Sequence, residues 1–193
     1  MTDLNKIKAL TTEELIQHYE VSEEAQAHIL PENNPQINIE LLAQRGLFHD
    51  AVSLLAHGLP KREAVWWACL ATRASITPET DETNMAALVA AEAWVKKPTE
   101  ERRIKCRDLA QQTLFKSAPS WAATAASWST GSLSKEGEPE VTPPEYLYAH
   151  AVAGSVSLAA TGSDPEKMSD NYNLFLKQGF DLARGGNGQV GTD

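Results

Sequence analysis

The sequence predicts an all-α protein, a compact array of short helical hairpins around a central helix that contains two adjacent tryptophans. Apolar residues recur at the three- and four-residue spacing of amphipathic helices along most of the chain. Glycine, proline and capping residues stand between these segments, where they end one helix and begin the next. No segment alternates between apolar and polar residues as a β-strand does. The layout resembles a solenoid loosely, without a repeat of fixed period.

The first 60 residues predict two short helices and then a longer hairpin. Thr12 and Ser22 each precede a pair of glutamates, which is typical of a capped helix start. We expect the second of these helices to run to about Leu30. The prolines and asparagines of 31–35 break the chain, and two further helices follow over 36–58.

The segment 61–73 is the most apolar helix and the predicted centre of the fold. Gly58 suits the position after a helix end, and Pro60 suits the first turn of the next helix. In a helix the side chains of Trp66 and Trp67 point about 100° apart and cannot share a face. A helix that is apolar on several faces is normally buried between others. We expect this helix to form the core and to leave one indole for a partner groove.

Four more helices are expected after the central one, over about 82–96, 99–114, 117–128 and 145–160, with a last one that ends near Arg184. Between them, residues 129–144 form the longest non-helical piece, and loops of that length are uncommon unless they are mobile or functional. The segment 149–160 is almost entirely small or apolar, which indicates a buried helix.

Length and composition limit the domain organisation and the partners. The 193 residues suit one domain: a lead-in with a short helix at 1–20, an all-helical domain at 21–186 and a flexible tail at 187–193. A net charge of −9 disfavours nucleic acid and anionic membranes as partners. No run resembles a signal peptide or a bilayer span, and two cysteines give no disulfide framework. We expect a cytoplasmic protein in a bacterial-type, reducing compartment.

The sequence carries no recognisable catalytic signature. The five histidines form no H-E-x-x-H pair, and no C-x-x-C is present. Cys69 lies in the most apolar segment, where a thiol is normally inert. The glycines of 185–191 follow a helix instead of joining a strand to a helix, so they do not form a phosphate loop. We therefore predict no catalytic residue, no metal, no cofactor and no enzymatic activity.

The run over residues 55–71, which contains R-E-A-V-W-W-A-C-L, resembles the signature of an uncharacterised bacterial family, a domain of unknown function. Residues 90–95, 127–133 and 149–154 fit the layout of that family as well, and the resemblance spans roughly residues 20–186. It implies a genomic neighbourhood near type VI secretion genes, which is an association and assigns no role.

The first functional hypothesis is a protein-interaction module, an adaptor or accessory protein of a secretion apparatus. Such a protein needs complementary shape more than reactive groups, which fits the missing motifs. Its partner would contact loop 129–144 and the first turns of the central helix, namely Lys61, Arg62, Glu63, Trp66 and Trp67.

Two alternatives remain open at this point. A small-ligand-binding or catalytic helical domain would need an inter-helix pocket where polar groups converge, such as His57, Arg62, Glu63 and Glu92. A homo-oligomeric structural protein would use the helix at 149–160 as its interface. The sequence gives neither the oligomeric state nor the identity of a partner.

Overall fold

The computed structural model describes residues 4–135, 137–162 and 164–190, and in these ranges the chain is helical without a strand. The predicted all-α class is therefore confirmed. The helices, in chain order, are α1 (Glu13–Ile16), α2 (Glu23–Gln26), α3 (Pro35–Gln44), α4 (Phe48–Gly58), α5 (Lys61–Ser75), α6 (Glu82–Lys96), α7 (Glu100–Gln112), α8 (Ala118–Trp128), α9 (Leu147–Thr161), the 3₁₀ helix η1 (Pro165–Lys167) and α10 (Met168–Ala183).

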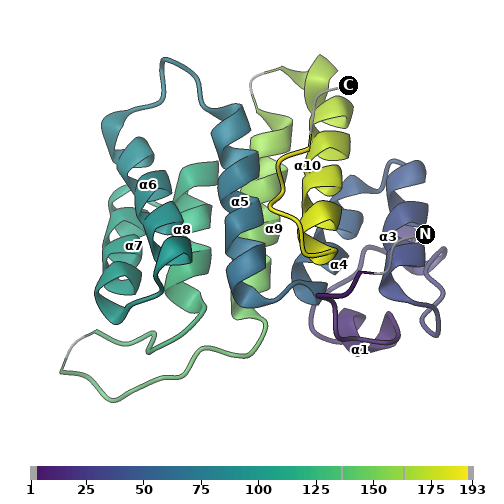
Figure 1. Cartoon of the computed structure of the whole chain (residues 1–193), viewed down its shortest axis with the longest axis horizontal. Helices are drawn as coiled ribbons and strands as arrows, with labels where there is room; N and C mark the ends of the chain where they lie inside the picture. Colours follow the sequence, from purple (N-terminus) through teal and green to yellow (C-terminus); the bar gives the residue numbers. More distant parts are fainter. Residues whose placement is uncertain (1–3, 136, 163, 191–193) are drawn as a thin grey trace.

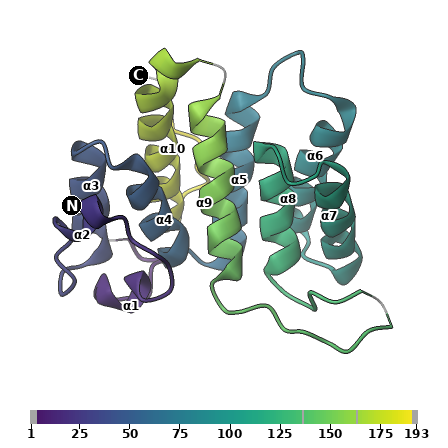
Figure 2. The same cartoon turned by 180° about the vertical axis from the view of Figure 1, so that it is seen from behind.

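Helix α5 stands in the middle of the molecule, with α6, α7 and α8 on one side and α10, α4 and α3 on the other (Figure 1). Helix α9 lies along α5 and also contacts α8, α4 and α10 (Figure 2). The short helices α1 and α2 lie beside α3 and α4, at the far end from α7. The helices pack as a compact array around α5, as expected.

The two faces of α5 differ in the way that its sequence predicts. Trp67 and the small or apolar residues around it are buried against α9, α8 and α10. On the outer face Trp66 and Leu70 are only half-buried, and Arg73 is exposed. The predicted boundary between two helices is also present, since α4 ends at Gly58 and α5 begins at Lys61.

Helices α8 and α9 pack through small side chains and form the interior beside α5. In α9 the residues at 149, 151–153, 155, 156, 159 and 160 are buried within this chain. The oligomer hypothesis placed a subunit interface on this same segment, and that placement is wrong, because the helices of the chain itself already cover it. Its exposed positions include His150 and Leu158.

The last described residues fold back over the body. Gly185 has φ +93°, and its N–H and that of Gly186 bond to the carbonyl oxygens of Leu182 and Asp181, at 3.0 and 2.9 Å. This is a Schellman end, which turns the chain out of the helix axis. Residues 186–190, which we call the strap, then run between α5 and α10 (Figure 1). The predicted flexible tail thus includes ordered contacts at 187–190, and 191–193 lie outside the described residues.

Residues 4–10 lie against the same end of the molecule. The Lys6 N–H donates to the Ala183 carbonyl at 2.8 Å, and Leu4 and Leu15 belong to the common hydrophobic core. The lead-in therefore packs on the predicted domain from Leu4 onward, and residues 1–3 lie outside the described part. Among the described residues, no helix has both the length and the apolar character that a bilayer crossing requires.

Candidate functional site

The charged first turn of α5 makes contacts to three other parts of the chain. Arg62 Nε donates to the Val95 carbonyl at 2.6 Å, at the end of α6, where carbonyls lack helical partners. Glu63 pairs with Lys6 at 3.1 Å, and the Lys61 ammonium lies 5.7 Å from the centroid of the Tyr148 ring. All three predicted charged residues thus have intramolecular partners at the surface.

The two adjacent indoles have separate roles. Trp67 is fully buried, and its Nε1–H donates to the Phe175 carbonyl in α10 at 2.7 Å. It presents no surface to a partner, so its assignment as a contact residue is wrong: the 100° offset between neighbouring helical residues turns it into the core. Trp66 is half-buried, and its Nε1–H donates to the main-chain oxygen of Asn187 at 3.0 Å.

A surface groove of about 330 Å³ runs beside Trp66, and we call it the Trp66 groove. Its walls come from the first turns of α5, the end of α6, and the end of α10 with the strap. Three of the predicted contact residues therefore meet in one concavity. The lining residues are Arg62, Glu63, Trp66, Val95, Lys96, Leu182, Gly186 and Asn187.

Lys61 lines a different and larger concavity of about 560 Å³, which we call the His57 cavity. Its rim carries Lys6, Lys8 and Lys61, and its wall includes His57 and Tyr146. Sequence reasoning missed Lys8 and Tyr146, because they are distant in the sequence from α4 and α5 and no short motif joins them.

The imidazole of His57 is buried and only partly satisfied. Its Nδ1 lies 2.7 Å from the Ser53 carbonyl, which sets Nδ1 as the protonated nitrogen of the neutral ring. Its Nε2 has no hydrogen-bond partner among the described residues. Burial lowers the pKa of His57 to about 4, against the opposing effect of the bond to Ser53, and His150 and His18 lower this pKa further. His57 is therefore neutral at pH 7.

Aromatic rings pack around His57 from three parts of the chain. Tyr19 stacks on it with ring centroids 4.4 Å apart, and His150 meets it edge-on at 4.9 Å. Tyr146 lies 5.9 Å away and stacks on His18 at 4.1 Å. This cluster joins the segment after α1 to α4 and to the start of α9.

The polar groups that the ligand hypothesis grouped together do not converge. Glu92 binds the guanidinium of Arg73 through both carboxylate oxygens, each at 2.8 Å. Arg62 and Glu63 line the Trp66 groove, whereas His57 lines the other cavity. That part of the hypothesis is wrong, because Glu92 is used in a surface ion pair on a different stretch of α5.

The described residues contain no group of three or more His, Cys, Asp or Glu side chains that could hold a metal. Cys69 and Cys106 are free and buried. Burial raises the pKa of the Cys69 thiol well above its ordinary range and that of Cys106 to about 12. Both thiols are therefore protonated at pH 7, and a protonated thiol is a poor nucleophile.

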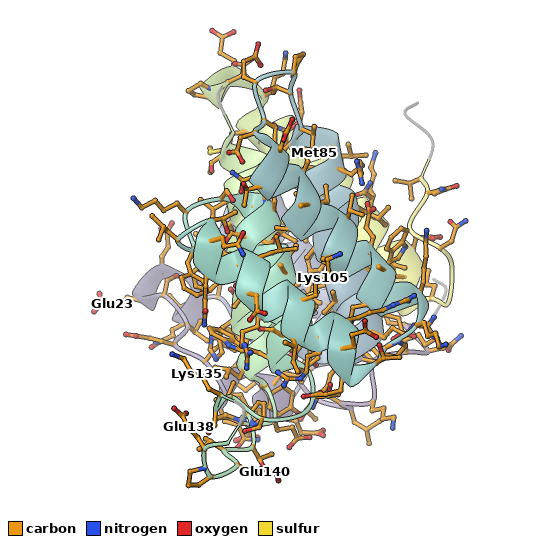
Figure 3. All side chains as sticks on the ribbon, turned by 90° about the vertical axis from the view of Figure 1, so that its left-hand side faces the viewer. Glu23, Met85, Lys105, Lys135, Glu138 and Glu140 are labelled. Atoms are coloured by element: carbon orange, nitrogen blue, oxygen red, sulfur yellow. The ribbon has the colours of Figure 1, made fainter. Side chains whose placement is uncertain are left out.

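Loop 129–144 is anchored at its base and exposed at its tip. Arg103 is buried and donates to the Ser127 carbonyl at 3.1 Å, while Arg107 reaches the Ser134 carbonyl at 3.3 Å. The Leu133 N–H donates to the Val141 carbonyl at 2.9 Å. The charged side chains of the tip point away from the helices, as Figure 3 shows for Lys135, Glu138 and Glu140.

The fold and its surface concavities define an all-helical protein with two candidate recognition sites, both lined by residues from the first turns of α5. A family model described as "Family of unknown function (DUF6931)" matches residues 38–183, and the chain belongs to that family. Neither the curated proteins nor the solved structures contain a match to this chain.

Proposed function

We propose that this protein is a non-enzymatic protein-interaction module of the bacterial cytoplasm, an adaptor or accessory protein of a type VI secretion system. The observation that carries the interaction role is the Trp66 groove, where three of the predicted contact residues meet at the surface. The link to secretion depends on the resemblance of the signature over residues 55–71 and on the neighbourhood that it implies.

The groove has the composition that protein interfaces use at their centre. A tryptophan presents a large apolar face together with one N–H donor, and such residues dominate interface energetics. Leu182 and Val95 extend the apolar floor, and the exposed Lys96 and the half-buried Glu63 supply a charged rim of both signs. A groove of this kind suits a peptide segment with one apolar side chain and flanking charges.

Site-directed photo-cross-linking in native cells tests the proposal. A photoreactive amino acid in place of Lys96 should capture one specific protein at the groove. The matched control replaces Lys105, which is exposed on the outer face of α7 (Figure 3), and it should capture nothing specific. Mass spectrometry of the captured band then shows whether it is a secretion component. Equal capture at both positions, or none at Lys96, would count against the interaction role.

A matched pair of substitutions separates binding from folding. Trp66→Ala should abolish the cross-link, since it removes the apolar wall of the groove. Trp121→Ala replaces another half-buried tryptophan, in α8 and away from the groove, and should leave the cross-link intact. Loss of the cross-link in both variants would indicate a folding defect.

A second candidate function, binding of a small anionic ligand, is favoured by the His57 cavity. Its volume of about 560 Å³ lies in the range of small-molecule sites, and its lining carries three lysines against two carboxylates, those of Glu14 and Glu145. Titration with benzoate and with inorganic phosphate, followed by NMR, tests this function. Lys8→Met should weaken binding of either probe, whereas Lys177→Met, at a concavity elsewhere on α10, should not. An unchanged spectrum up to millimolar probe would exclude this class of ligand.

A further inference from the structure

One peptide group in the middle of the strap makes hydrogen bonds to two helices of the body. The oxygen of the Asn187–Gly188 peptide accepts the Trp66 indole N–H at 3.0 Å, from α5. The N–H of the same peptide donates to Asp181 Oδ2 at 2.8 Å, from α10. The oxygen and the N–H of a trans peptide point in opposite directions. Trp66 and Asp181 therefore clamp this group from its two sides.

The clamp is selective for glycine on the N–H side of the peptide. Gly188 has φ +76°, a conformation that side chains rarely adopt, and it is buried. A Cβ at this position would overlap Leu70 Cδ1 and lie 3.3 Å from Leu182 Cγ. The pair of α5 and α10 therefore accepts an X–Gly peptide, in which the side chain of X is free to vary.

The strap is more exposed to solvent than the core of the protein. Gly186, Asn187 and Gln189 are exposed, and Val190 is half-buried. Asn187 contributes to the clamp through its main chain, while its side-chain oxygen accepts from the Gln189 N–H within the strap itself. Removal of the strap would expose little apolar surface apart from Trp66, Leu70 and Leu182, so a competing segment could displace it.

We propose that the clamp of Trp66 and Asp181 is a recognition site for an X–Gly segment of a partner protein whose glycine takes a positive φ, and that the strap is its intramolecular occupant. The inference rests on the proposed interaction function. The strap shows the chemistry that a partner must reproduce: an exposed peptide oxygen for the indole, and a glycine that fits over Leu70. The open Trp66 groove beside it receives the flanking side chains of the partner.

The test uses the full chain and a synthetic peptide of residues 185–193 as the probe. Gly188→Val should release the strap and shift the indole ¹⁵N–¹H signal of Trp66, which Trp66→Phe assigns. The control Gly137→Val places valine at φ +86° where a Cβ meets nothing within 4 Å, and it should leave that signal in place. A signal that stays unmoved in Gly188→Val would overturn the proposal.

Addition of the peptide should return the Trp66 signal of Gly188→Val toward its wild-type position. Binding to the wild-type chain should be about tenfold weaker, because the tethered strap competes at a high effective concentration. A peptide with valine at the Gly188 position should not bind. Equal affinity for both chains, or equal binding of the valine peptide, would contradict the clamp. If Gly188→Val does not fold, Gly188→Ala replaces it with the same expected outcomes, because any Cβ at this position meets Leu70 and the clamp residues stay unchanged.

Light scattering on the wild-type chain tests whether the clamp holds the strap of its own chain or the strap of a second copy. A monomer is expected, and a dimer that exchanges straps between copies would overturn the intramolecular assignment. The titration needs no cellular partner. Its failure is therefore distinguishable from a failure of the cross-linking experiment on the proposed function.

Discussion

The indole N–H of Trp67 reaches the main-chain oxygen of Phe175 at 2.7 Å and joins the central helix to α10 inside the core. Trp67→Phe removes this hydrogen bond and leaves a cavity, so the free energy of unfolding should fall by about 2–4 kcal/mol. Urea denaturation measures the change. Trp66→Phe, next to it on the half-buried face, should cost less than about 1 kcal/mol. Equal losses would mean that the neighbouring indoles are buried alike.

Two helical glycines should respond to alanine in opposite directions. A Cβ at Gly179 in α10 would lie 2.6 Å from Leu55 Cδ2 and 2.9 Å from Trp67 Cε2. Gly179→Ala should therefore destabilise the protein by about 1–3 kcal/mol through overpacking. At Gly154 in α9 the nearest atom, in Trp121, is 3.6 Å away. Gly154→Ala should stabilise it by about 0.5–1 kcal/mol, because alanine favours the helix. Thermal melts of the two variants compare these signs directly.

The turn that follows α7 holds two non-glycine residues in the left-handed region, Leu114 at φ 57° and Phe115 at φ 56°. This conformation costs roughly 1–2 kcal/mol for most side chains and less for asparagine. Since Leu114 is 63% exposed, Leu114→Asn should raise the free energy of unfolding by about 0.5–1 kcal/mol. Leu10→Asn changes another exposed leucine, one without a positive φ, and should have little effect. If Leu114→Asn lowered the free energy of unfolding, the left-handed conformation of Leu114 would not be a source of strain.

The buried His57 should make stability depend on pH below neutrality. Its pKa is about 4 in the folded chain and 6.5 ordinarily, so between these values the unfolded state binds more protons. Stability is therefore full above pH 6.5 and falls as the pH drops to about 4, by up to about 3 kcal/mol. Denaturation midpoints measured across this window should flatten in His57→Phe, which keeps the ring packing. A wild-type profile as flat as that of the variant would show that the folded ring protonates normally.

Much of the fold follows from local signals. Gly58 and Pro60 mark the boundary between α4 and α5 correctly, because the conformational preferences of these residues act within one or two positions. The small residues of 149–160 likewise predict a buried helix. These features need no knowledge of the remaining chain.

The features that the sequence could not give depend on distant partners. Helix α2 stops at Gln26, short of the predicted Leu30, where the side chain of Asn38 bonds both the N–H and the carbonyl of Leu30. Which of the two indoles, Trp66 or Trp67, is buried in the core depends on where α10 packs. The Trp66 groove depends on Asn187, which lies 121 positions from Trp66 in the segment predicted to be a flexible tail.

Helix α8 carries a consequence for the way the molecule opens. Nine of its eleven residues are buried, and it contacts α5, α6, α7 and α9. Apart from the half-buried Trp121 and Trp128, the residues of this helix reach solvent only when neighbours on several sides separate. Its amide protons should therefore exchange with deuterium only through global unfolding, whereas amides of the strap and of loop 129–144 exchange through local opening. The order in which the amides exchange would thus rank the segments by the free energy that their opening requires.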